Sequence, residues 1–171
     1  SKLGRANKTL LFVGTKRQAR DVVRESARAA GMPFVTERWL GGTLTNFETI
    51  RASIRRLDGI EQEISAPEYM RQSKKVQSRH QREKRRILRN LEGVRNMTRL
   101  PDAMFVVDPN KELSAVREAK RLNIPIIGLV DTDTDPDLVN LPIPGNDDGI
   151  RSIQAIMKVI VDGLAKGRSE Q

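Results

Sequence analysis

Two aspartates in the last third of the chain have the types and spacing of a phosphoryl-transfer site. Asp131 and Asp133 follow the apolar run "IIGLV" in the segment "IIGLVDTDTDPD". Ligands bind beyond the carboxyl ends of parallel strands, so this position suits an active site. In such a site the first carboxylate acts as the nucleophile, the second as acid and base, and magnesium stabilises the charge. Asp147 and Asp148 could supply further magnesium ligands.

This segment resembles the first motif of the haloacid-dehalogenase-type phosphotransferases, but its surroundings argue against that activity. Pro136 follows so soon that no cap insert or helix begins in this loop. The pair Asp147–Asp148 begins sixteen residues after Asp131, which leaves no room for the strands and the lysine motif of that family. An acidic loop with Asx turns, followed by capping of the last helix by Asn146 or Asp147, is the alternative.

Other residue types used in catalysis and metal binding are scarce. The chain has no cysteine, and its one histidine, His80, lacks a second ligand four residues away. The phosphate-binding pattern G-x-x-x-x-G-K-[ST] is absent. We therefore expect no metal site, no cofactor and, if the aspartate hypothesis fails, no catalytic residue.

Two segments favour anion binding instead. In "VGTKRQAR", Thr15 is placed to cap a helix that begins with Lys16 and Arg17. Cations in a first turn oppose the helix dipole by about 0.3–1 kcal/mol each, so their presence favours an anionic ligand over helix stability alone. The basic stripe continues at four-residue steps through Arg20, Arg24 and Arg28. The alternative is an ordinary solvated face.

The second segment, "RWLGGTLTNFET", contains the only tryptophan. Thr45 followed three residues later by Glu48 predicts a capping box at a helix start. Gly41 and Gly42 allow another backbone to approach closely, and the helix N-terminus beyond them offers free N–H groups to a phosphate. The alternative is structural: Thr45 caps the helix, the glycines form a turn, and Trp39 packs on the domain.

The charge distribution indicates a polyanionic partner. The net charge is +9 and the sequence pI is about 10.3. Residues 1–50 hold nine Lys/Arg and four Asp/Glu, residues 51–99 fourteen and six, and residues 100–171 eight and twelve. Aromatics are only 4%, which disfavours base-stacking platforms. No apolar run is long enough to span a membrane and no signal peptide is recognisable, so a cytoplasmic or organellar setting is expected.

Alternating strands and helices predict a parallel sheet covered by helices, an α/β fold. Strands without polar alternation, as in a sheet buried on both faces, are predicted at 8–14, 33–40, 102–108 and 124–131, with a short strand or turn at 141–145. Helices are predicted at 15–31, 45–60, 70–96, 111–123 and 147–167.

About 60 residues without a strand interrupt this alternation, more than one crossover helix needs. Apolar residues at three- and four-residue steps predict the seam of an antiparallel helical hairpin: Ile50, Ile54, Leu57 and Ile64, then Ile87, Leu91 and Val94. The second helix, 70–96, would extend roughly 40 Å, and its outer half has almost no apolar face. We expect a hairpin (coiled coil) at 48–97, inserted in an α/β domain of 1–47 and 98–171, with a basic end that binds a partner. The alternatives are a charged spacer and an adaptor that binds protein only.

The chain resembles the family of bacterial small-subunit ribosomal protein two. The blocks that carry the resemblance span nearly the whole chain: "LFVGTKRQA", "RWLGGTLTNFETIR", "RLPDAMFVVDPNKE", "LNIPIIGLVDT", "DPD" and "IPGNDDGIRSI". Two features depart from the family. Its usual N-terminal region is missing before Ser1, and Arg99 replaces a glycine before "LPDA".

The resemblance implies a flavodoxin-like, doubly wound α/β domain with a protruding hairpin, located on the small ribosomal subunit. It implies contacts with small-subunit rRNA and neighbouring proteins, a role in holding ribosomal protein one, and no catalysis, membrane or small-molecule substrate. Combined with the charge pattern, it leads us to expect rRNA binding by Lys16, Arg17, Arg20, Arg38, Trp39, Gly41, Gly42, Thr43, Asn46, Arg71, Lys74, Lys75, Arg79 and Arg82.

Overall fold

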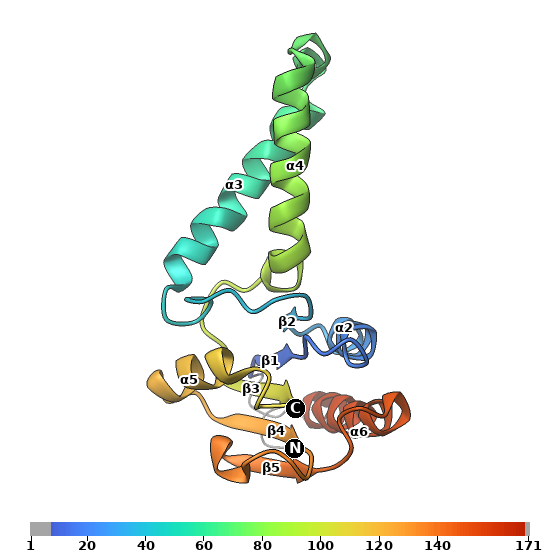
Figure 1. Ribbon diagram of the computed structural model, residues 1–171. Helices are drawn as coiled ribbons and strands as arrows, with labels where there is room; N and C mark the ends of the chain where they lie inside the picture. Colours follow the sequence, from blue (N-terminus) through green and yellow to red (C-terminus); the bar gives the residue numbers. More distant parts are fainter. Residues whose placement is uncertain (1–7, 170–171) are drawn as a thin grey trace.

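A five-stranded parallel sheet forms the centre of the molecule (Figure 1). The computed structural model describes residues 8–169. The strands are β1 (Leu10–Val13), β2 (Phe34–Val35), β3 (Ala103–Val107), β4 (Ile126–Val130) and β5 (Leu141–Pro144). Their order is β2-β1-β3-β4-β5, and every neighbouring pair is parallel. This is the order of flavodoxin-like doubly wound folds, so the predicted fold class is confirmed.

Helices cover both faces of this sheet. Helices α2 (Arg20–Ala29) and α6 (Ile150–Ser169) lie side by side on one face, and α5 (Leu113–Arg121) lies on the other (Figure 1). Successive strand residues alternate between the two cores, with Phe12 and Phe105 toward α2 and α6, and Leu11 and Met104 toward α5. Strands β1 to β4 read as unbroken apolar runs because both of their faces are buried, whereas the edge strand β5 is mostly exposed.

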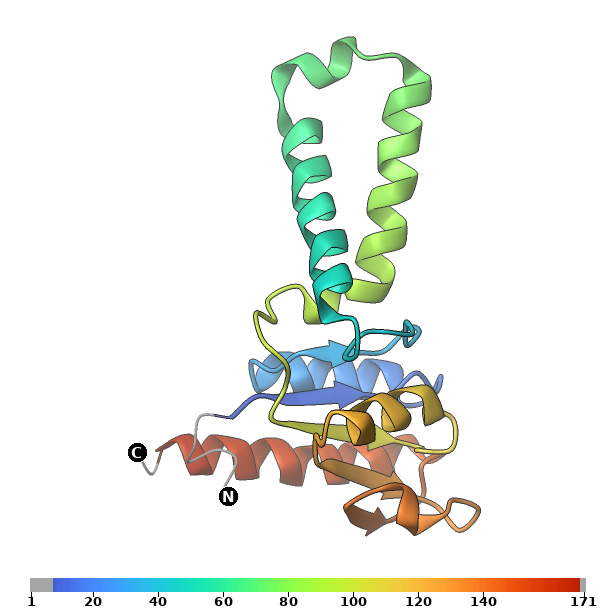
Figure 2. The same cartoon turned by 90° about the vertical axis from the view of Figure 1, so that its left-hand side faces the viewer.

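Two long helices rise from the β2 end of the sheet. Helices α3 (Phe47–Ser65) and α4 (Lys74–Leu91) pack against each other and project away from the α/β core (Figures 1 and 2). All the apolar residues predicted as their seam are buried or pack against the core cluster. A coiled coil in the strict sense, and the domain boundaries given above, stay predictions.

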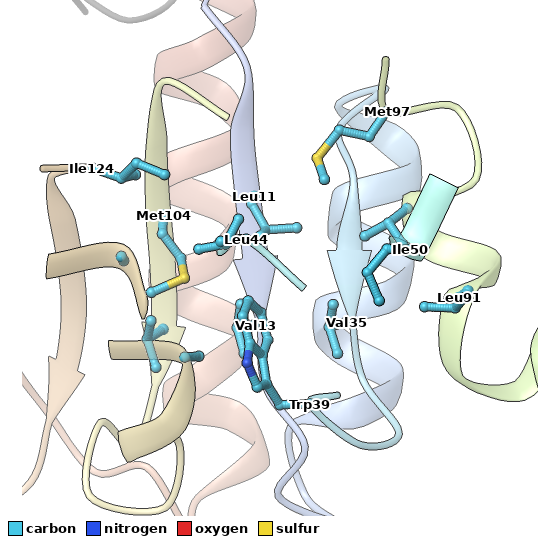
Figure 3. Close-up of a cluster of buried hydrophobic side chains, with 14 of the residues drawn as sticks. Leu11, Val13, Val35, Trp39, Leu44, Ile50, Leu91, Met97, Met104 and Ile124 are labelled. Carbon is cyan, nitrogen blue, oxygen red and sulfur yellow. The ribbon is translucent and has the colours of Figure 1, made fainter. Parts of the chain in front are cut away.

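The base of these helices shares one apolar core with the sheet. The cluster includes strand residues, the segment after β2 and the first and last turns of the hairpin; Figure 3 labels Leu11, Val13, Val35, Trp39, Leu44, Ile50, Leu91, Met97, Met104 and Ile124. Continuous packing of this kind fixes the direction in which the helices leave the sheet, because closely packed interiors resist small displacements.

The second hairpin helix is shorter than predicted. Helix α4 has 18 residues, or about 27 Å, rather than the expected 27 residues. It begins where Ser73 accepts a hydrogen bond from the Val76 N–H, and a separate 3-10 turn, Pro67–Arg71 (η1), forms the tip. It ends at Leu91, where a second 3-10 turn, Glu92–Val94 (η2), brings Gly93 against β2.

Two predicted helix starts were also wrong. Helix α2 begins at Arg20, not next to Thr15, and its N-cap, Ala19, makes no side-chain capping hydrogen bond. Helix α3 begins at Phe47 with Asn46 as N-cap and no side-chain cap, so the capping box of Thr45 and Glu48 does not form. In addition, the second strand contains only the two residues of β2, because the chain then turns away into the segment that contains Trp39.

Polar contacts hold the outer part of the hairpin together where apolar residues are few. His80 is buried and stacks on Tyr69, with ring centroids 6.0 Å apart, and its Nδ1 lies 3.4 Å from the Glu63 carboxylate. Nearer the sheet, ion pairs bridge the two helices between Arg56 and Glu83 and between Lys84 and Glu61.

Among residues 8–169, no helix is both long and apolar enough to cross a membrane.

We predict opposite effects for two glycine-to-alanine substitutions in the hairpin. A Cβ at Gly93 would lie 2.1 Å from the Phe34 carbonyl oxygen, so Gly93→Ala should lower the free energy of unfolding by about 2–3 kcal/mol. Gly59 lies inside α3 with nothing within 4 Å of an added Cβ, so Gly59→Ala should stabilise by about 0.5–1 kcal/mol. Urea unfolding followed by circular dichroism measures both. Equal effects of the two substitutions would contradict the close approach of η2 to β2.

Candidate nucleic-acid interface

The carboxyl edge of the sheet is occupied by the chain's own lysine. The Nζ of Lys16 lies 2.6 Å from carboxylate oxygens of Asp147 and Asp148 and 3.3 Å from one of Asp108. Burial alone would lower the pKa of Lys16, but hydrogen bonds to Asp147 and Asp148 hold it above its ordinary value. Lys16 therefore has its counterions inside the protein, at the position where folds of this type bind ligands.

The neighbouring loops are built from local hydrogen bonds. Thr15 donates its N–H and hydroxyl to Glu112, and burial raises the pKa of that carboxyl group. Asp131 accepts N–H groups of Thr132 and Asp147, which lower its pKa. Through these hydrogen bonds the Asp131 carboxylate joins the loop after β4 to the loop that contains Asp147.

The remaining contacts agree with the alternative expected for the acidic loop, which is a set of Asx turns followed by the start of the last helix. Asn146 Oδ1 accepts the N–H groups of Asp148 and Gly149 at 2.8 and 2.7 Å, so Asn146 forms the turn that leads into α6. Asp133 is exposed and accepts the Thr134 hydroxyl at 3.3 Å. Within the described part of the chain, no group of three or more His, Asp or Glu side chains is arranged to hold a metal ion.

The Gly-Gly segment does bind an anion, but the anion is Glu118 of α5. One carboxylate oxygen of Glu118 accepts the indole N–H of Trp39 at 3.0 Å and the N–H of Gly42 at 2.8 Å. The other accepts the N–H groups of Leu44 and Thr45 at 3.0 Å and the Thr45 hydroxyl at 3.1 Å. Burial opposes ionisation of Glu118, yet these donors outweigh it and lower its pKa.

This arrangement explains the single tryptophan. Trp39 is buried in the core cluster (Figure 3). Its indole N–H donates a hydrogen bond to Glu118. Thr43 is also buried and donates its hydroxyl to the Leu40 carbonyl. These residues position the segment, whereas Gly41, Asn46 and the neighbouring Arg38 are exposed on its surface.

The cations predicted to bind RNA fall into two groups. Lys16 pairs with aspartates, and Arg20 donates to Glu37 at 3.3 Å and to the Thr15 carbonyl at 3.0 Å. The other seven are exposed, and none has a carboxylate within 4 Å among residues 8–169: Arg17, Arg38, Arg71, Lys74, Lys75, Arg79 and Arg82. Five of these seven lie on the tip and on α4, so most of the unpaired cations in this predicted set belong to the hairpin.

Two features of this surface were not predicted from the sequence. Glu118 was not recognised as the partner of the Gly-Gly segment, because more than 70 residues separate them. Arg85, Arg86 and Arg89 were not included among the cations, although they are exposed and continue the three- and four-residue spacing of Arg79 and Arg82. That spacing was the available signal.

Comparison with known proteins identifies close relatives over nearly the whole chain. The family model of ribosomal protein S2 matches residues 1–167. The chain is 52% identical over 170 residues to the small ribosomal subunit protein uS2 of Rhodopirellula baltica, covering 99% of this chain and 65% of that protein. It is 55% identical over 160 residues to uS2 of Thermus thermophilus, covering 94% and 62%. The chain thus spans less than two thirds of the length of these relatives.

We predict that Glu118→Gln destabilises the fold. The amide lacks the charge and one of the two acceptors, so buried donors lose their partners, and the free energy of unfolding should fall by about 1.5–3 kcal/mol at pH 7. Glu25→Gln removes an exposed carboxylate on α2 and serves as the matched control, with little change expected. Urea unfolding measures both variants.

The same pair of variants gives a pH dependence. Because the folded-state pKa of Glu118 is lowered, its contribution is fully present above the ordinary pKa of about 4.3 and is lost as the pH falls through the folded value. Glu118→Gln should therefore lose less stability than the wild type between pH 6 and about pH 3. An identical acid dependence in both proteins would show that the carboxylate does not hold this segment.

Proposed function

Because the chain belongs to the ribosomal protein S2 family, we propose that it is a structural constituent of the small ribosomal subunit that binds small-subunit rRNA. The observation that carries this proposal is the family match over residues 1–167, together with identities of about 50% to proteins named small ribosomal subunit protein uS2. The exposed cations of the hairpin support an electrostatic mode of binding.

In this mechanism the hairpin acts as an arm that brings positive charge to the phosphate backbone. We propose that residues 48–97 form the arm and that 1–47 and 98–171 form its base. Arg71, Lys74, Lys75 and Arg79 are exposed near the tip and have no internal counterions among the described residues. Each phosphate that such a cation neutralises releases counterions, so affinity falls steeply with salt and needs no base-specific contact.

The remaining predicted residues contribute in different ways. Arg17, Arg38, Gly41 and Asn46 are exposed and are proposed as further contacts. Lys16, Arg20, Trp39, Gly42 and Thr43 are proposed to support these contacts by holding the loops, since each of them is engaged inside the protein.

Catalysis is not part of the proposal. The matching family is one of ribosomal proteins, not of enzymes. The phosphotransferase alternative has no support in the comparisons. In addition, both carboxylate oxygens of Asp131 accept hydrogen bonds from backbone N–H groups. Asp131→Asn is therefore expected to leave RNA binding unchanged.

Neighbouring ribosomal proteins, including ribosomal protein one, are proposed as further partners on the cytoplasmic ribosome. Membership of a ribosomal protein family supports the proposal that the chain has neighbouring ribosomal proteins as partners. The acidic balance of residues 100–171, with twelve Asp/Glu against eight Lys/Arg, is compatible with a basic protein neighbour on that side.

We predict that the tip cations set the salt dependence of RNA binding. The triple substitution Lys74→Gln, Lys75→Gln, Arg79→Gln should lower the slope of log K against log salt by about two to three units, because each lost phosphate contact removes about one unit. Filter binding to small-subunit rRNA across a salt titration measures the slope.

A charge-matched control separates contact from net charge. Lys111→Gln, Arg117→Gln, Arg121→Gln removes three exposed cations from α5 and the loop before it, far from the hairpin tip. Its slope should equal that of the wild type. Equal losses in both triple variants would mean that only the overall charge matters, and absence of rRNA binding would overturn the proposed function.

A further inference from the structure

A cavity of about 600 Å³ lies at the amino edge of the sheet, opposite the edge that holds Lys16. One wall comes from the end of α2 and the start of β2, and the other from residues 92–99, through which the hairpin returns to β3 (Figure 2). Small-molecule sites have volumes of about 300–1,000 Å³ and are common at such junctions. The cavity therefore has the size and the place of a ligand site, and the proposed function does not use it.

Positively charged side chains converge on this cavity from both walls. Arg28, Arg95 and Arg99 line it, against one carboxylate, Glu92. Arg95 is paired with two carboxylates of α3, which lie outside the cavity. Arg28 and Glu92 pair at 2.7 Å, and both side chains are more than half exposed. Exposed pairs of this kind are weak, so an incoming anion competes with Glu92 for Arg28 at low cost.

Arg99 is the least engaged of the three cations. Its guanidinium lies 3.5 Å from Asp102, a carboxylate that already accepts hydrogen bonds from Lys8 and from the Thr9 N–H at 2.9 Å. Within residues 8–169, the N–H groups of Thr98 and Arg99 donate no hydrogen bond. Guanidinium forks and free backbone N–H groups are donors that suit a phosphate, so this wall favours a phosphate-bearing ligand.

The floor of the cavity is apolar. Met32, Phe34 and Met97 line it and are 7%, 7% and 6% exposed. Arg28 lies over the Phe34 ring, 5.6 Å from its centroid, which places a flat stacked surface beside the cations. Guanidinium planes and methionine sulfur pack favourably against flat rings. The floor therefore suits a flat, uncharged ring next to a charged group.

The walls are held in place by contacts within the protein. Gly93 lies so close to β2 that an added Cβ would be 2.1 Å from the Phe34 carbonyl oxygen. The N–H of Met97 donates to the end of η2 at 3.0 Å, and that of Met32 donates to the last turns of α2 at 2.9 Å. A preformed site loses less conformational freedom when a ligand binds, which favours affinity.

We propose that this cavity binds a mononucleotide, with the phosphate between Arg28 and Arg99 and the base against the apolar floor. The guanidinium groups supply charge-assisted hydrogen bonds to the phosphate, and Met32 and Met97 pack against the base. The ligand joins the end of α2 to the return segment of the hairpin, so its binding raises the thermal midpoint of the folded chain. This activity is separate from rRNA binding by the hairpin tip.

Calorimetric titration of the full chain with AMP and GMP, in about 0.15 M salt, measures the affinity. A ligand of this size in a preformed site should bind with a Kd on the order of 10–100 μM. Adenosine, guanosine and inorganic phosphate are the part-ligands. Each should bind at least about tenfold more weakly than the nucleotides, because each lacks one of the two sets of contacts.

Substitutions with opposite expected effects separate ligand binding from folding, which circular dichroism verifies for each variant. Arg28→Gln with Arg99→Gln should weaken nucleotide binding at least about tenfold, because both phosphate contacts are lost. Glu92→Gln removes the carboxylate that competes for Arg28, so it should tighten binding by about threefold. Arg117→Gln with Arg121→Gln removes the same charge from α5 and should leave the affinity unchanged.

Amide NMR spectra locate the ligand on the molecule. The signals of Gly31 and Gly93, which line the cavity, should shift when AMP or GMP is added. Those of Gly59 in α3 and Gly145 at the opposite edge of the sheet should not.

Four results would overturn the inference: neither nucleotide binds, a part-ligand binds as tightly as the nucleotide, the double arginine variant keeps the wild-type affinity, or the shifts fall on the hairpin instead of the cavity. Weaker binding by Glu92→Gln would also contradict it, because that carboxylate would then support the site instead of competing with the ligand. None of these results bears on rRNA binding by the tip cations, so the proposed function stands or fails by its own salt titration.

Discussion

The carboxylate of Glu118 is the interaction on which the geometry of the molecule depends. It collects two side-chain donors and three backbone N–H groups from one short segment, 39–45, and ties that segment to α5. The segment is the only link between β2 and α3, so its path decides where the hairpin starts. Charge-assisted hydrogen bonds are about twice as strong as neutral ones, and several of them on one carboxylate make a rigid joint. The hairpin can therefore present its cations in a fixed direction.

The charged side chains at the carboxyl edge of the sheet and those of the hairpin are neutralised to different extents. At the carboxyl edge of the sheet, aspartates surround Lys16 and the loops close on one another. The position at which flavodoxin-like folds bind ligands is therefore filled by the protein itself. On the hairpin the reverse holds, since exposed cations remain without partners in the described chain. The inserted helices thus carry a dense group of exposed cations without internal counterions, which is the surface that we propose for a polyanion.

Local patterns predicted the features of the fold that depend on local physics. Strands β1 to β4 were recognisable because each is a largely buried apolar run, whereas the edge strand β5 is mostly exposed. The seam of α3 and α4 was recognisable because Ile50, Ile54 and Leu57 repeat at helical spacing. The predicted caps failed because the partners are distant: Thr15 binds Glu112, and Thr45 binds Glu118. For the same reason, the sequence pattern could not separate Lys16, which is internally paired, from exposed cations such as Arg17. Spacing along the chain describes one helix or loop, whereas pairing depends on residues that only the fold brings together.

The placement of acidic residues explains how so basic a hairpin can be stable. Glu61 pairs with Lys84 and Arg95, Asp58 also contacts Arg95, and Glu83 pairs with Arg56, so these carboxylates bridge the base and the inner faces of the two helices. Exposed pairs of this kind contribute little individually, but here they link α3 to α4 and to Arg95, the residue that follows η2. Placing the acids between the helices has a second consequence. The outward face of α4 is left with arginines and few counterions, so the arrangement that joins the helices is also the one that leaves their outer surface free for a phosphate backbone.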